Sequence, residues 1–84
     1  MRHFTSPAFW QCHKVLPGPI QRLAEKNFKL LKDDPQHPSL HSEKIGRFWS
    51  VRIGRFYRAL GVDAPGGILW FWIGNHPDYE KLLG

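Results

Sequence analysis

Residues 48–76 read FWSVRIGRFYRALGVDAPGGILWFWIGNH and are predicted to form three consecutive antiparallel strands. Trp, Phe, Tyr, Val and Ile, which favour strands, are enriched here, and Gly or Pro recurs at short intervals. The predicted turns fall at Gly54-Arg55 and at Ala64-Pro65-Gly66-Gly67. The predicted strands run from Phe48 to Ile53, from Phe56 to Val62 and from Ile68 to Ile73.

Two helices are predicted ahead of these strands. Ser6 is an N-cap followed by Pro7 at the first helical position, and this helix is expected to run to about Val15. Pro19 opens a second helix, which Asp33-Asp34-Pro35 ends. The apolar stripe of the second helix is Ile20, Leu23, Ala24, Phe28 and Leu31, and its other face carries Arg22, Lys26, Lys29 and Lys32.

Three further segments complete the expected order. Arg2 to Thr5 is an expected edge strand, Leu40 to Ile45 is either a short strand or an extended lead-in, and Pro77 to Leu83 is a short helical turn. This order predicts a two-layer α+β fold, with the helical hairpin packed on one face of an antiparallel sheet. Ile68 to Ile73 is continuously apolar and is expected to be the central strand. The other face of the sheet is expected to be open unless a partner or substrate covers it.

The chain of 84 residues, 1–84, is expected to be one small domain. Its one cysteine, Cys12, excludes an internal disulfide and fits a reducing compartment. No run approaches the ~20 apolar residues of a membrane-spanning helix, and the start of the chain lacks a signal-peptide pattern. We therefore expect a cytoplasmic protein that has no membrane partner.

The chain carries a net charge of +5, which suits a polyanionic partner. Five cations lie within fifteen residues, with no Asp or Glu between Lys44 and Val62: Lys44, Arg47, Arg52, Arg55 and Arg58. Aromatic residues alternate with them, which is typical of surfaces that follow a phosphate backbone. We therefore predict RNA contacts for Lys44, Arg47, Arg55 and Trp49, although many basic surfaces are merely solvated.

Arg52 and Arg58 flank the Gly54-Arg55 turn, and the sequence leaves two registers open. With a two-residue loop, the two arginines point to opposite faces of the sheet. With a bulge or one more loop residue, they pair directly and share a face. Arg58 is the stronger candidate for chemistry, because it interrupts an otherwise apolar strand.

His76 and Tyr79 follow the last predicted strand. If Pro77 is the first residue of the terminal turn, His76 occupies its N-cap position. His76 is then either a capping residue without a chemical role or a proton donor, and Tyr79 is near enough to share its site or to serve packing. The histidines and the cysteine have no metal-ligand spacing, and there is no Gly-rich phosphate loop, so no metal or cofactor is expected.

These residues resemble a known pattern. Phe48-Trp49-Ser50, Arg52-Ile53 and Tyr57-Arg58, followed by His76 eighteen residues after Arg58, are similar to the RelE/ParE superfamily of bacterial toxin–antitoxin toxins. In motif, they are most similar to the YoeB-type members. The order of helices and strands extends this resemblance over essentially the whole chain, 1–84.

The resemblance implies a toxin that a cognate antitoxin neutralises by wrapping a segment over it, with operator DNA bound only through that complex. RelE-like and YoeB-like members cleave mRNA on the ribosome, whereas ParE-like members inhibit DNA gyrase without that catalytic set. By resemblance, Arg58 stabilises charge on the phosphate, His76 is the general acid and Arg52 contacts phosphate. Tyr79 is the nearest match to the family's terminal tyrosine, which here is displaced by Pro77.

The general base of YoeB-type enzymes is a glutamate with no clear match in this sequence. Pro38-Ser39-Leu40 lacks a carboxylate, which leaves Glu43 or His41 as substitutes. Three functions therefore stay open: an endoribonuclease, a ParE-like gyrase inhibitor, and a degenerate toxin that binds its antitoxin alone.

Overall fold

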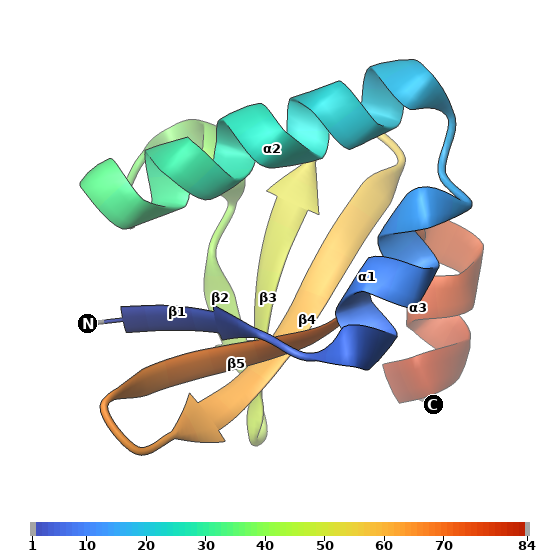
Figure 1. Cartoon of the computed structure of the whole chain (residues 1–84). Helices are drawn as coiled ribbons and strands as arrows, with labels where there is room; N and C mark the ends of the chain where they lie inside the picture. The colour runs from blue at the N-terminus through green and yellow to red at the C-terminus, as the bar shows by residue number, and fades with distance from the viewer. Residues whose placement is uncertain (1, 84) are drawn as a thin grey trace.

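The computed structural model describes residues 2–83, which form five strands, three α-helices and one short 3₁₀ helix (Figure 1). In chain order the elements are β1 (Arg2–Thr5), α1 (Pro7–Lys14), α2 (Gly18–Asp33), the 3₁₀ helix η1 (Pro38–Leu40), β2 (Glu43–Ile45), β3 (Phe48–Ile53), β4 (Tyr57–Ala64), β5 (Gly67–Asn75) and α3 (His76–Leu83). The three strands predicted between residues 48 and 73 are confirmed. β4 begins one residue later than predicted, and β5 is longer at both ends.

The five strands form one sheet in the order β1-β5-β4-β3-β2. β2 to β5 pair in antiparallel fashion, as predicted, whereas the edge strand β1 pairs parallel with β5. Residues 68–73 lie in an interior strand, as predicted, because β5 is flanked by β1 and β4, although the middle strand of the five is β4. The apolar run in β5 is still explained, since the strand has a neighbour on each side.

The first helix begins where the sequence predicts. Ser6 Oγ accepts a hydrogen bond from the Phe9 N–H at 3.3 Å, and Pro7 needs no donor partner in the first turn. In α2 the predicted apolar stripe faces the sheet and buries Ala24 and Leu31. Helix formation and burial therefore follow from the same 3.6-residue periodicity.

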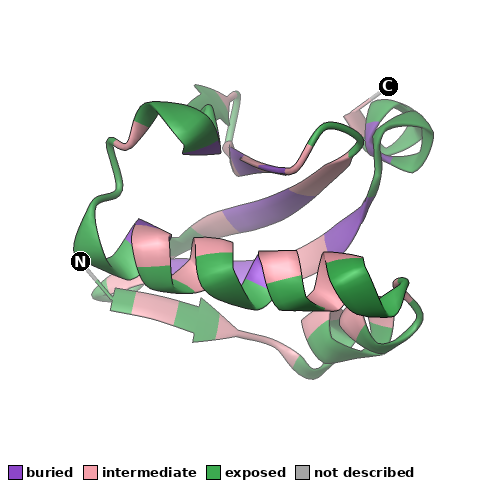
Figure 2. Ribbon diagram, turned by 90° about the horizontal axis from the view of Figure 1, so that it is seen from above, coloured by how far each residue is buried: buried purple, intermediate pink, exposed green. Residues whose placement is uncertain are grey.

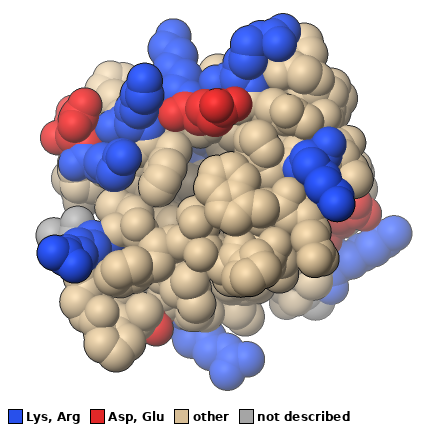
Figure 3. Space-filling view, viewed as in Figure 1, with Lys and Arg blue, Asp and Glu red and all other residues tan. Residues whose placement is uncertain are grey.

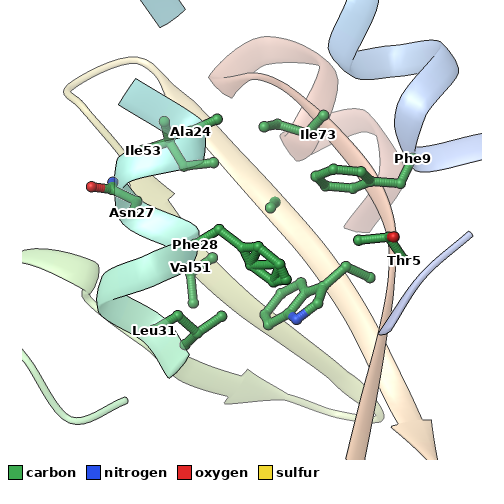
Figure 4. A pocket seen from close by; sticks show the side chains of 11 residues that line it. Thr5, Phe9, Ala24, Asn27, Phe28, Leu31, Val51, Ile53 and Ile73 are labelled. Atoms are coloured by element: carbon green, nitrogen blue, oxygen red, sulfur yellow. The ribbon is translucent and has the colours of Figure 1, made fainter. Parts of the chain in front are cut away.

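Both helices cover the same face of the sheet. Phe9 of α1 and Phe28 of α2 line a small apolar pocket of about 40 Å³ together with Val51, Trp70 and Ile73 of the strands (Figure 4). Seen from above, the strands beneath α2 carry buried residues, while the outer side of α2 is exposed (Figure 2). The predicted helical hairpin on one sheet face is thus confirmed.

The opposite sheet face is partly covered by α3. Ser50 and Leu60, which pair across β3 and β4, are 0% and 1% exposed. Tyr79 of α3 is buried and lies over Trp72 of β5, with ring centroids 6.5 Å apart. The expected terminal turn is an eight-residue helix, and the expectation of an open face is corrected where this helix packs.

Candidate active site

Arg58 lies at the centre of a polar cluster on the α3 side of the sheet. Its Nε donates to Ser50 Oγ at 2.8 Å, and its Nη2 donates to the His41 carbonyl oxygen at 3.2 Å. Glu43 Oε1 lies 3.7 Å from the same Nη2. The Arg58 side chain is 13% exposed, so these contacts hold a largely buried guanidinium in one orientation.

The register of the β3–β4 hairpin decides which side chains meet Arg58. Ile53 pairs with Tyr57, so Gly54, Arg55 and Phe56 form a three-residue turn, in which Gly54 has a φ of +64°. Arg52 therefore pairs directly with Arg58, and the second of the two open registers is the one adopted. A glycine fits this turn because a left-handed φ strains other residues.

Tyr79 joins Arg58 to His76. The Arg58 guanidinium carbon lies 5.1 Å from the centroid of the Tyr79 ring. On the same ring, the His76 imidazole stacks with a centroid distance of 5.8 Å and an interplanar angle of 28°. An arginine and a histidine eighteen residues apart are thus brought to one aromatic ring by the packing of α3 against the sheet.

The start of α3 positions His76, but His76 is not the N-cap. The Asn75 side-chain oxygen accepts a hydrogen bond from the Asp78 N–H at 2.9 Å, so Asn75 is the capping residue and the expectation for His76 is corrected. Asparagine is a good cap, and the helix begins one residue earlier than Pro77. The His76 N–H donates to the Phe56 carbonyl at 2.7 Å, which ties α3 to the β3–β4 turn.

Two members of this cluster were not singled out from the sequence. Ser50 is recognisable only through the β3–β4 register, which places it diagonal to Arg58. Glu80 lies four residues after His76 on α3, and its Oε1 is 2.8 Å from His76 Nε2. The i, i+4 spacing of His76 and Glu80 indicates such a contact only on a helix of at least two turns, and the sequence was interpreted as a single turn.

Arg52 shares the sheet face of Arg58 but lies outside this cluster. It lines a recess with Lys26 and Leu30 of α2 and with His37. Its Nε is buried and has no hydrogen-bond partner among residues 2–83. The backbone of Arg52 is held by Asn27 Nδ2, which donates to its carbonyl oxygen at 3.3 Å.

Lys44 and Trp49 lie on the sheet face opposite to Arg58. Both contact Asp63: Lys44 Nζ lies 2.7 Å from Oδ2, and Trp49 Nε1 donates to Oδ1 at 2.8 Å. The hydrogen bond from Lys44, followed by that from Trp49, lowers the pKa of the Asp63 carboxyl. Lys44 also lies 4.8 Å from the Trp49 ring centroid, so its charge is largely engaged within the protein.

Arg47 and Arg55 lie at opposite ends of β3. Arg47 stacks over Phe48, 5.3 Å from its ring centroid, and Arg55 is exposed in the β3–β4 turn. Arg47 also lines a recess with Asp63, the residue that Lys44 and Trp49 contact, so three of the four residues predicted to contact RNA lie at one end of β3 and Arg55 lies at the other. A further basic group lies on the outer side of α2, at the top of Figure 3, and consists of Arg22, Lys26, Lys29 and Lys32.

Two general features of residues 2–83 bear on the class of site. Within this range, the structure brings together no group of three His, Cys, Asp or Glu side chains able to hold a metal ion. Over the same residues, every helix is too short or too polar to cross a lipid bilayer.

Comparison with known proteins agrees with this architecture. The RelB-RelE antitoxin–toxin complex from Methanococcus jannaschii contains a chain with the same fold, at a TM-score of 0.75 and 14% identity, and the match covers 96% of this chain and 99% of that one. No curated protein matches the sequence. The family profile described as a ParE-like toxin domain matches residues 19–81, which span α2 to α3. The chain therefore belongs to the family of ParE-like toxin domains.

Proposed function

We propose that this protein is the toxin of a toxin–antitoxin system and cleaves mRNA on the ribosome. The observation that carries the proposal is the convergence of Arg58 and His76 on the ring of Tyr79, at 5.1 Å and 5.8 Å. RNA cleavage by attack of the 2′-hydroxyl needs a cation at the phosphate and a proton donor at the leaving oxygen. The proposal includes the closer resemblance to YoeB-type members, in which the residues that match Arg58 and His76 have these two roles.

The proposed reaction uses the side chains of the cluster in sequence. A base takes the 2′-hydroxyl proton, and the 2′-oxygen attacks the adjacent phosphorus. Arg58 stabilises the added negative charge, and the bond from phosphorus to the 5′-oxygen breaks as His76 gives that oxygen a proton. The products are a 2′,3′-cyclic phosphate and a free 5′-hydroxyl.

Glu43 is the better of the two proposed bases. Its carboxylate lies 3.7 Å from Arg58 Nη2, so it faces the group that would hold the phosphate. His41 contributes its backbone carbonyl to the same guanidinium, which places that residue's backbone at the site. Glu43→Gln is therefore expected to slow cleavage more than His41→Gln does.

The proposed partners are a cognate antitoxin, the ribosome and its mRNA, all in the cytoplasm. Support for the antitoxin comes from the toxin domain family and from the chain of similar fold in the RelB-RelE antitoxin–toxin complex from Methanococcus jannaschii. Operator DNA is expected to be bound through the antitoxin. Lys44, Arg47, Arg55 and Trp49 remain proposed RNA contacts, and the three basic residues are all exposed.

A second candidate function is inhibition of DNA gyrase. The matching family profile is named for ParE, and this name favours a gyrase inhibitor. In that case the cluster around Arg58 is structural, and binding to a protein replaces RNA cleavage.

Cleavage of ribosome-bound mRNA by purified protein tests the leading proposal. Arg58→Ala and His76→Ala are expected to abolish cleavage, whereas Arg2→Ala is a matched control, because Arg2 is exposed on the far edge strand β1. Wild-type protein that leaves mRNA intact but arrests growth with gyrase-linked DNA breaks would favour the second candidate.

A further inference from the structure

His76 and Glu80 form a pair on the exposed side of α3. They lie one helical turn apart, and His76 Nε2 is 2.8 Å from Glu80 Oε1. A carboxylate oxygen accepts and does not donate, so the hydrogen of this contact belongs to the imidazole. The neutral ring then carries its proton on Nε2 and leaves Nδ1 without one.

A second contact restricts the same ring. His76 stacks on Tyr79 at an interplanar angle of 28°, which limits how far the imidazole tilts. Tyr79 is itself buried at 6% exposure and lies beneath the Arg58 guanidinium. Stacking on Tyr79 sets the plane of the His76 imidazole, and the contact with the Glu80 carboxylate directs Nε2 along α3. The two contacts together therefore define the orientation of His76 Nδ1.

We propose that Glu80 is a positioning residue that presents His76 Nδ1 as the proton-donating nitrogen. This inference rests on the proposed nuclease function. The protonated ring carries hydrogens on both nitrogens, and the Nδ1 hydrogen passes to the 5′-oxygen as the bond to phosphorus breaks. The neutral ring that remains keeps its Nε2 hydrogen on Glu80, so the carboxylate supports the ring before and after transfer.

Exposure of the pair separates this role from a role in stability. The two side chains are 54% and 65% exposed, and exposed ion pairs contribute little to folding. Loss of the carboxylate is therefore expected to leave the fold intact while releasing the imidazole. A purely structural contribution would leave the rate of chemistry unchanged.

The test compares Glu80→Ala, Glu80→Gln and the matched control Glu25→Ala, which removes an exposed glutamate from α2. In nitrogen-15 spectra of the neutral imidazole, the chemical shifts of the two nitrogens are expected to show the hydrogen on Nε2 and none on Nδ1 in wild type, in Glu80→Gln and in the control. Glu80→Ala is expected to show a mixture of the two tautomers, because glutamine keeps an accepting oxygen and alanine does not.

The kinetic part measures mRNA cleavage by the same variants. Glu80→Ala is expected to lower kcat about tenfold with KM unchanged. This loss is a part of the rate acceleration of roughly 10²–10⁴-fold that a correctly positioned general acid supplies. Glu80→Gln is expected to retain most of kcat. Wild-type behaviour of Glu80→Ala in both measurements would overturn the inference, as would a Glu80→Gln variant as slow as the alanine variant. If wild type cleaves no mRNA, the proposed function fails, while the spectra still decide whether Glu80 holds the ring.

Discussion

Arg52 and Arg58 lie directly opposite each other on β3 and β4, but their guanidinium groups have different surroundings. Arg58 donates to Ser50 and to the His41 carbonyl, whereas Arg52 Nε is buried without a partner among residues 2–83. Like charges directly opposite each other destabilise a sheet, and divergence of the two side chains reduces this cost. Pairing in the sheet therefore does not place both arginines in one site.

Ser50→Ala tests how Arg58 is held. Ser50 is 0% exposed, and its removal leaves the Arg58 Nε without its acceptor in a largely buried setting. We expect a loss of about 1–3 kcal/mol in the free energy of unfolding, measured with urea, and slower mRNA cleavage. Ser42→Ala is the matched control, because it removes the hydroxyl of an exposed serine that lies just before β2. Equal stability of the two variants would show that the Ser50 hydrogen bond contributes nothing measurable.

Gly74→Ala tests the wall of the same site. Gly74 pairs with Arg58 across β4 and β5, and a Cβ there would lie 2.5 Å from Trp72 Cζ2. The indole must then move, at a cost of about 1–3 kcal/mol in the free energy of unfolding. Because Trp72 packs against Tyr79, we also expect slower cleavage. Gly18→Ala is the control, since a Cβ there would lie 3.4 Å from Arg22 Nη1, an ordinary contact distance. A Gly74→Ala variant as stable as this control would contradict the predicted clash between the new Cβ and Trp72.

Much of this fold was predictable, and the missed parts have a common physical cause. Strand composition and Gly or Pro punctuation located β3 to β5, and the capping pattern located α1. The parallel pairing of β1 with β5 joins residues more than sixty positions apart, which no local pattern records. The register of Arg52 depended on whether the turn held two residues or three, and the sequence permits both.

The candidate site shows the same limit. The spacing of Arg58 and His76 was visible in the sequence, and the structure places both against Tyr79. The contact of His76 with Glu80 was missed, because it depends on α3 continuing for two turns. Lys44, Trp49 and Arg47 all lie near Asp63 at one end of β3, whereas Arg55 lies in the turn at the other end.

Acid is expected to destabilise the protein through His3. Burial, with the charge of Lys32 adding to it, lowers the pKa of His3 below its ordinary value of 6.5. The neutral ring accepts a hydrogen bond from Trp70 Nε1 at 3.1 Å, a contact that protonation of Nδ1 removes. The unfolded chain binds the proton more tightly than the folded one, so stability falls as pH decreases from 6.5 through the lower folded pKa.

The measurement for His3 is Tm as a function of pH for wild type and His3→Gln. Wild type is expected to lose Tm below pH 6.5, and His3→Gln is expected to show a shallower slope in the same window. His41→Asn serves as the control and is expected to follow wild type, because His41 is exposed, its contact with Arg58 is made by the backbone carbonyl, and asparagine tolerates its left-handed φ of 44°. Parallel curves for wild type and His3→Gln would contradict the role of His3.

Tyr79→Phe and Tyr79→Ala separate two roles of the tyrosine. Arg58 and His76 both contact its ring, at 5.1 Å and 5.8 Å, so a phenylalanine preserves the surface on which they meet. We expect Tyr79→Phe to retain cleavage within a few-fold, and Tyr79→Ala to lose cleavage together with about 3–5 kcal/mol of stability. Tyr57→Phe is the control for removing a hydroxyl. If Tyr79→Phe is as inactive as Tyr79→Ala while Tyr57→Phe is active, the hydroxyl takes part in the chemistry and the ring is more than a support.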